Sequence, residues 1–73
     1  MEVDIKSPLS GSIAQVVVKE GDTVNEGDTV AILESMKMEI PVESTAAGSV
    51  SKVSVAAGDF VKQGDTLVVV VEG

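Results

Sequence analysis

The chain has no cysteine and no histidine among its 73 residues. These absences exclude disulfide bonds, thiolate nucleophiles and imidazole bases, and they remove the usual ligands of zinc. Basic residues are also scarce, because five lysines stand against twelve acidic residues and give a net charge of −7. Such a chain repels the phosphate backbone of nucleic acids and favours basic partner surfaces. We therefore expect no nucleic-acid partner.

Long apolar runs are absent as well. The longest, from Leu67 to Val71, is far shorter than the ~20 residues that span a bilayer. The N-terminal residues Met1 to Asp4 include two acids and lack the basic start and apolar run of a secretory signal. The sequence therefore predicts a cytoplasmic protein that contacts no membrane, and its length predicts one small domain over residues 1–73.

The most prominent pattern is an internal duplication. A shift of 37 residues aligns 5–33 with 42–70 and keeps glycines and aspartates in register, at Gly11/Gly48, Gly21/Gly58, Gly27/Gly64, Asp22/Asp59 and Asp28/Asp65. A repeat of this kind predicts that both halves follow the same path and are related by an approximate two-fold axis. Residues 34–41 separate the two copies and lie outside the repeat.

Each copy is predicted to form short strands, because Val, Ile and Thr dominate and apolar residues recur at a spacing of two. The expected strands cover residues 2–7, 12–18, 23–25, 29–34, 38–44, 49–55, 60–62 and 66–72. The Gly-Asp pairs mark tight turns, and Gly11 and Gly48 are expected to permit the turn before the second strand of each copy. A calcium loop is the weaker interpretation of these pairs, since each offers one carboxylate where calcium takes about six to eight oxygen ligands.

The predicted fold class is all-β. Two four-stranded copies that share one core suggest a flattened antiparallel β-barrel or sandwich, in which each half covers the apolar face of the other. The alternating pattern predicts a core made of Ile5, Ile13, Val16, Val18, Val24, Val30, Ile32, Leu33, Val50, Val53, Val55, Val61, Leu67 and Val69.

The segment Glu34-Ser35-Met36-Lys37-Met38 is unusual for its place. It lies between two predicted strands and should form the tip of a hairpin, yet it contains no Gly, Asn or Asp, the residues that tolerate the positive φ of tight hairpin turns. Two methionines at an exposed tip also disfavour solubility. Local rules tend to be broken where function overrides them, so the segment is predicted to hold a functional site.

This segment resembles the target sequence of the biotinyl and lipoyl carrier domains, whose biotinyl branch has its lysine in a Glu-Ala-Met-Lys-Met box. Here Ser35 replaces the usual alanine. The resemblance covers nearly the whole chain, because members of the family also consist of two glycine-punctuated β repeats around the box. It implies a flattened barrel with the lysine hairpin at one end and both termini at the other. The protruding loop that some members carry in the first copy has no counterpart, because 11–21 and 48–58 have equal length.

The resemblance implies that Lys37 carries biotin in amide linkage. Met36 and Met38 would be recognition residues, because methionine adapts to more than one partner surface, with packing of the turn as their alternative role. Glu34 occurs in both branches of the family, so it indicates a carrier without choosing the cofactor. No base in the sequence would activate the lysine, which predicts a carrier and substrate rather than an enzyme.

The partners that the resemblance implies are a biotin protein ligase and the subunits of a carboxylase. The ligase would form the amide from biotinyl-adenylate. A biotin carboxylase would then load the tethered ring with a carboxyl group from bicarbonate with ATP, and a carboxyltransferase would pass that group to an acceptor. The isolated chain is expected to be a monomer.

Three alternatives stay open at this point. A lipoyl carrier would have Asp before the lysine and usually Ala after it, where this chain has Met36 and Met38, and one protein that accepts both cofactors is a related possibility. An unmodified interaction module with a lipoyl-like barrel typically lacks the target lysine. A free-standing enzyme is the weakest alternative, because the chain has no acid-base or nucleophile constellation.

Overall fold

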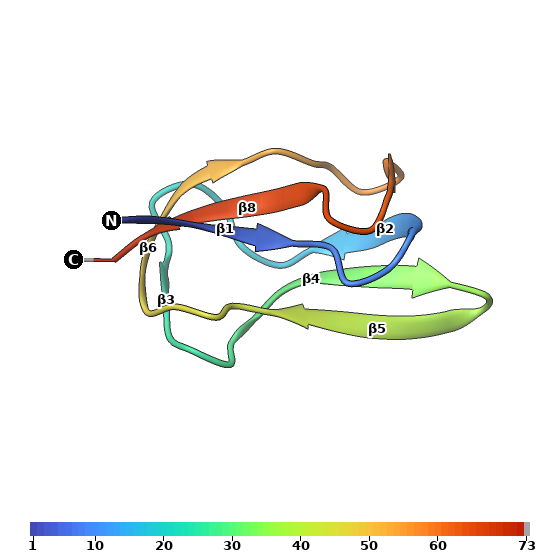
Figure 1. Cartoon of the computed structure of the whole chain (residues 1–73), viewed down its shortest axis with the longest axis horizontal. Helices are drawn as coiled ribbons and strands as arrows, with labels where there is room; N and C mark the ends of the chain where they lie inside the picture. Colours follow the sequence, from blue (N-terminus) through green and yellow to red (C-terminus); the bar gives the residue numbers. More distant parts are fainter. Residues whose placement is uncertain (73) are drawn as a thin grey trace.

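A computed structural model describes residues 1–72 as an all-strand protein in which two four-stranded antiparallel sheets face each other (Figure 1). The strands are β1 (Glu2–Lys6), β2 (Gly11–Val16), β3 (Thr23–Val24), β4 (Thr29–Ser35), β5 (Met38–Glu43), β6 (Gly48–Val53), β7 (Phe60–Val61) and β8 (Thr66–Val71). One sheet has the order β1-β8-β6-β3 and the other β5-β4-β2-β7. Each sheet thus combines two strands from each copy, so the expectation that one half covers the other was wrong. The predicted fold class is confirmed, although β2 and β6 each end two residues earlier than expected.

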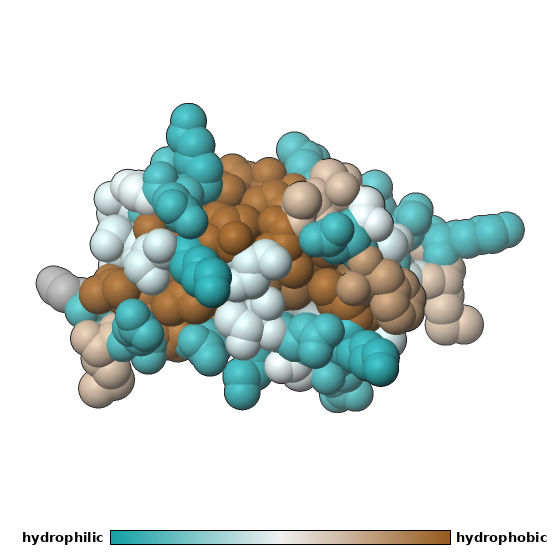
Figure 2. Space-filling view, turned by 90° about the horizontal axis from the view of Figure 1, so that it is seen from above, coloured by the Kyte–Doolittle hydropathy of each residue, from teal (hydrophilic) through white to brown (hydrophobic). Residues whose placement is uncertain are grey.

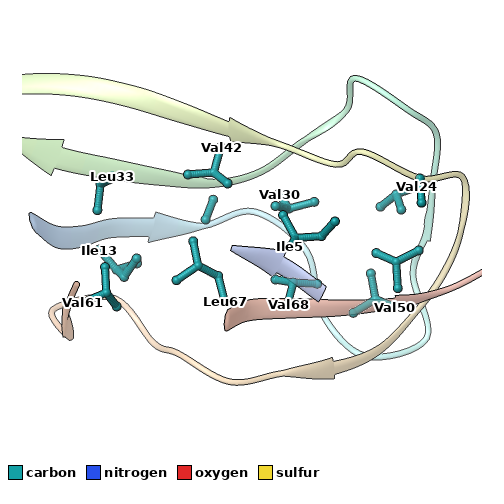
Figure 3. Packing of buried hydrophobic residues seen from close by; sticks show 13 residues of the cluster. Ile5, Ile13, Val24, Val30, Leu33, Val42, Val50, Val61, Leu67 and Val68 are labelled. Carbon is teal, nitrogen blue, oxygen red and sulfur yellow. The ribbon is translucent and has the colours of Figure 1, made fainter. Parts of the chain in front are cut away.

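The core lies between the two sheets, where side chains from both meet (Figure 3). Leu33 and Val42 face Ile13 and Val61 toward one end of the molecule, and Val24 lies near Val50 toward the other. Branched aliphatic side chains suit this arrangement because they pack well on a pleated surface. The buried cluster consists of Ile5, Ile13, Val24, Val30, Ala31, Leu33, Val42, Ala46, Val50, Val61, Leu67, Val68 and Val70.

Of the predicted core residues, Val16, Val18, Val53 and Val55 are partly buried and pack against this cluster, whereas the prediction was wrong for Ile32 and Val69. Each is only partly buried and lies between two buried neighbours on its strand. The cause is a β-bulge, because the pairing registers of β4 with β5 and of β1 with β8 both shift and leave one extra residue, Val30 and Leu67 respectively. A bulge shifts the alternation of side chains by one position. Ala31 and Val68 are therefore buried, and Ile32 and Val69 are turned away from the core.

The two-fold relation predicted from the duplication appears in the hydrogen bonds that join the halves. The backbone N–H of Gly21 donates to the carbonyl of Val50 at 2.8 Å, and the equivalent Gly58 donates to Ile13 at 2.7 Å. The four Gly-Asp turns are also alike, since each glycine has a φ between 92° and 96°. In each turn the aspartate carboxylate accepts a backbone N–H from three residues earlier, so these carboxylates serve the turns.

Gly11 and Gly48 have a different role from the predicted one. Both lie at the first position of a strand, and neither has a positive φ. A Cβ atom at Gly11 would lie 2.5 Å from the carbonyl oxygen of Glu34, and a Cβ at Gly48 would overlap the carbonyl oxygen of Val71. These glycines are needed because neighbouring backbone approaches them closely.

The molecule measures 36 × 18 × 18 Å along its principal axes. The β4–β5 hairpin forms one end of the long axis, and the N-terminus and the end of β8 lie at the opposite end (Figure 1), as the family resemblance implied. The N–H of Glu72 donates to the carbonyl of Met1 at 2.9 Å, which joins the terminal segments. Within residues 1–72, no helix is long and apolar enough to cross a membrane.

Candidate functional site

The β4–β5 hairpin closes through a two-residue turn. Ser35 pairs with Met38, which leaves Met36 and Lys37 as the turn, with φ angles of 52° and 64°. Positive φ at both central residues defines the type I′ turn, whose twist matches that of the flanking strands and which usually holds Asn and Gly. The predicted hairpin tip is therefore confirmed, and Met36 and Lys37 adopt the positive φ that their residue types disfavour.

The positive φ angles of this turn lower the stability of the hairpin. An L-residue with a Cβ atom loses roughly 1–2 kcal/mol in the left-handed region, and two such residues follow one another here. The strand pairs from Thr29↔Glu43 to Ser35↔Met38 and the pairing of β4 with β2 on its other side hold the turn in place. Strain of this kind persists where the surrounding structure over-determines the backbone, and it clusters at functional sites.

The turn presents its side chains to solvent. Met36 is 91% exposed, Met38 is 60% exposed, and Lys37 is exposed as well. Figure 2 shows hydrophilic atoms that project far beyond the body of the molecule at this end, beside moderately hydrophobic ones. Because the lysine stands clear of the barrel on a rigid support, its amine can enter the active site of another protein. The position fits a group attached in amide linkage.

Glu34 lies one residue pair below the tip. It pairs directly with Glu39 across the two strands, and both carboxylates are exposed. Like charges in directly opposed positions destabilise a sheet, so the hairpin places negative charge beside Lys37 at some cost to its own stability. Of the predicted site residues, the structure therefore places Met36, Lys37 and Met38 at the tip and Glu34 beneath them.

Two neighbours of the hairpin were missed by the sequence analysis. Glu39 was not identified as a partner of Glu34, and Phe60 was not considered for any role. Phe60 of β7 pairs with Ser12 of β2, and Ser12 pairs in turn with Glu34, so these residues form one row across the sheet. The signal that could have found Phe60 is the repeat itself, because the equivalent position in the first copy is Thr23.

The duplicated barrel and its exposed lysine hairpin define a small carrier domain of the biotinyl and lipoyl type. Comparison with protein families agrees, since residues 1–70 match the family described as "Biotin-requiring enzyme". The chain belongs to this family.

Curated relatives carry names from the biotinyl branch. The chain is 54% identical over 37 residues to the "Methylmalonyl-CoA carboxyltransferase 1.3S subunit" of Propionibacterium freudenreichii subsp. shermanii, a match that covers 51% of this chain and 30% of that protein. It is 50% identical over 38 residues to the "Biotinylated protein TB7.3 homolog" of Mycolicibacterium smegmatis, which covers 52% of this chain and 54% of that protein. The matches thus span about half or less of these relatives' length.

A solved structure confirms the fold. The chain superposes on part of the urea carboxylase of Kluyveromyces lactis with a TM-score of 0.91 and 37% sequence identity, over 97% of this chain and 6% of that protein. The small share of the larger protein shows that the same barrel occurs there as one segment of a much longer chain.

Proposed function

We propose that this chain is a biotin carboxyl carrier whose cofactor is attached to the side chain of Lys37. The observation that carries the proposal is the position of this lysine, in a strained type I′ turn at the tip of the hairpin. The other four lysines, Lys6, Lys19, Lys52 and Lys62, lie outside this turn. Membership of the biotin-requiring family and the biotinylated relatives support biotin as the attached group.

The chain acts as a substrate in the attachment step. Acylation of the lysine amine releases a proton, and the sequence has no histidine to serve as a base. A biotin protein ligase therefore has to accept the proton while Nζ of Lys37 attacks the acyl carbon of biotinyl-adenylate. The new amide bond forms as the bond to AMP breaks. The barrel contributes the position of the amine.

The carrier role follows from the same geometry. Attached biotin supplies a ureido ring that holds a carboxyl group for transfer. A ring on a flexible arm at one end of a compact barrel can reach an effective concentration on the order of millimolar at two enzyme sites that both lie within its span. We propose biotin carboxylase and carboxyltransferase components as these partners, and the carboxylase names among the relatives support this. Cytoplasmic location and a monomeric state stay predictions.

The comparisons do not favour lipoate. The relatives are named as biotinylated, carboxyltransferase or carboxylase proteins, and Met36 and Met38 occupy the places where the lipoyl pattern has Asp and usually Ala. We therefore propose biotin as the cofactor rather than lipoate or both.

The test is modification of Lys37→Ala by purified biotin protein ligase with biotin and ATP. The variant should take up no biotin, while its free energy of unfolding should change by no more than about 0.5 kcal/mol, as for an exposed residue away from structural contacts. Lys52→Ala is the matched control and should be modified like the parent chain. Biotin uptake by folded Lys37→Ala would contradict the assignment, and a large loss of stability would assign the lysine a structural role.

A further inference from the structure

Comparison of the two repeat copies shows which surface residues the fold itself needs. Positions related by the shift of 37 residues have the same place in the two halves, so residues with a purely structural role should be similar in both. Val24 and Val61 are such a pair, because both are buried in the core. Pairs that differ strongly mark a requirement of one end of the molecule only.

Phe60 and its counterpart Thr23 differ in this way. Both residues open a two-residue strand, both are exposed, and each pairs with a serine, Ser12 or Ser49. Threonine thus satisfies the backbone at this position, yet the hairpin end has the only aromatic residue of the chain, 70% exposed. An exposed aromatic side chain that the fold does not need is characteristic of a contact surface.

Leu9 and its counterpart Ala46 show the same asymmetry. Ala46 is 3% exposed and belongs to the core, whereas Leu9 is 43% exposed in the connection between β1 and β2. This connection is tied to the segment after β7, because the N–H of Gln63 donates to Oγ of Ser10 at 3.2 Å. The hairpin end of the barrel therefore exposes two large apolar side chains, Phe60 and Leu9. The equivalent positions at the termini end hold the polar Thr23 and the small, buried Ala46.

Phe60 is close enough to the hairpin to share one partner with it. Phe60 and Glu34 are separated by one strand, β2, so their Cα atoms lie about 10 Å apart at the usual spacing of strands. The tip lies two to three residues beyond Glu34 along β4, which adds a similar distance. Met36 and Met38 expose further apolar surface there.

The end of the barrel alone is too small to form a stable interface. With transverse dimensions of 18 × 18 Å, the end of the barrel presents only about 300 Å² in cross-section, whereas a specific interface covers about 800 Å² on each partner. An enzyme centred on the tip must therefore also contact the sides of the barrel. Phe60 and Leu9 are exposed on these sides.

We propose that Phe60 and Leu9, together with Met36 and Met38, form the docking surface for the ligase that modifies Lys37. The matching surface of the ligase is an apolar pocket bordered by basic side chains, because Glu34 and Glu39 are exposed beside the tip and the chain carries a net charge of −7. The proposal rests on the modification of Lys37 proposed above.

The ligase is the partner that this surface fits best because of the reach of the side chain. The ligase must bring the lysine amine itself into its active site, and this amine ends a stem of only four carbons. Its surface therefore has to come close to the barrel. Enzymes that act on the attached group reach it at the end of a longer arm and can work further from Phe60.

The experiment is steady-state biotinylation by purified biotin protein ligase, with the carrier as the varied substrate. Phe60→Thr introduces the residue found at the equivalent position, and Leu9→Ala does the same for the second site. Each should raise the KM for the carrier about fivefold or more, which corresponds to roughly 1 kcal/mol, with kcat within twofold of the parent because the reacting groups are unchanged. The control Thr23→Phe places the aromatic ring at the termini end and should change neither parameter by more than twofold.

A competition assay separates docking from chemistry. Unmodifiable Lys37→Ala should inhibit biotinylation of the parent chain, and addition of Phe60→Thr should raise its inhibition constant by the same factor as the KM. The inhibition should weaken with added salt, because basic side chains border the pocket. Unfolding midpoints equal to that of the parent would confirm that the variants are folded.

Equal KM values for Phe60→Thr, Leu9→Ala and the parent chain would overturn the docking surface while leaving the assignment of Lys37 intact. An equal rise in KM for Thr23→Phe would also overturn it, since the effect would then not depend on the hairpin end. Absence of biotin on Lys37 of the parent chain would instead contradict the proposed function.

Discussion

Met36 and Lys37 are the only non-glycine residues with a positive φ in the part of the chain that the structure describes. Neither residue type tolerates positive φ well, and an Asn-Gly turn would close the same hairpin at lower cost. Under the proposed function, the chain thus gives up stability at the two positions whose side chains a partner would contact. Strain at a functional turn is the physical reason why the local sequence violates the turn rules.

A substitution at Met36 tests this explanation. Met36→Asn should raise the free energy of unfolding by about 0.5–1 kcal/mol, because asparagine occupies the left-handed region more readily than methionine. It should at the same time slow biotinylation, because the exposed methionine is removed. Denaturant titration and initial rates with purified ligase measure the two effects. A loss of stability would show that methionine stabilises the turn by packing, which was its alternative role.

The predictability of the site differs from residue to residue. Lys37, Met36 and Met38 were found from the sequence because they are contiguous and break a local rule. Glu39 follows opposite Glu34 once the turn is limited to Met36 and Lys37. Phe60 could not be placed beside Glu34, because its position depends on which strands β2 pairs with and in which register. Phe60 lies 26 positions after Glu34 in the chain, yet only one strand separates them in the sheet.

At the scale of the elements, the sequence predicted where each strand lies. It predicted only in part which side chains of each strand face the core. Alternating apolar residues and Gly-Asp turns predicted each strand to within about two residues. The bulges at Val30 and Leu67 then moved the buried face by one position, so Ile32 and Val69 were assigned to the core in error. The close approach of backbone to Gly11 and Gly48 was equally hidden, because it depends on how β2 pairs with β4 and β6 with β8 within each sheet.

The two strand glycines offer a matched pair of variants. Gly11→Ala and Gly48→Ala should each lower the free energy of unfolding by about 1–3 kcal/mol, since the added Cβ meets a backbone carbonyl that has to move. Only the Gly11 contact involves Glu34, so Gly11→Ala should also slow biotinylation of the folded protein. Gly48→Ala acts at Val71, near the termini, and should leave that rate unchanged.

Denaturant titration gives the stabilities, and initial rates are compared at equal concentrations of folded protein. Wild-type stability in both variants would show that the backbone at these positions relaxes freely. Equal slowing of biotinylation in both would show that the effect spreads through the whole barrel rather than acting at the hairpin.

At the scale of the whole molecule, the duplication separates what the fold needs from what the function needs. The halves agree at buried valines, turn glycines and turn aspartates, and their hydrogen bonds repeat across the two-fold axis. They differ at the two ends of the long axis. The hairpin lies at one end, and the paired terminal segments near Met1 and Glu72 take the equivalent place at the other end. One end of a nearly symmetric barrel is thereby specialised to present a lysine.

The central claim is that Lys37 is the one residue that carries biotin. Intact-mass measurement of protein made with biotin protein ligase in the cell, followed by peptide mapping, tests it most directly, because unmodified, biotinylated and lipoylated chains differ in mass. The account predicts one biotinyl group per chain, located on the peptide that contains Lys37. A chain that carries biotin on Lys52 or Lys62 while Lys37 stays free, or one that carries lipoate in place of biotin, would contradict it.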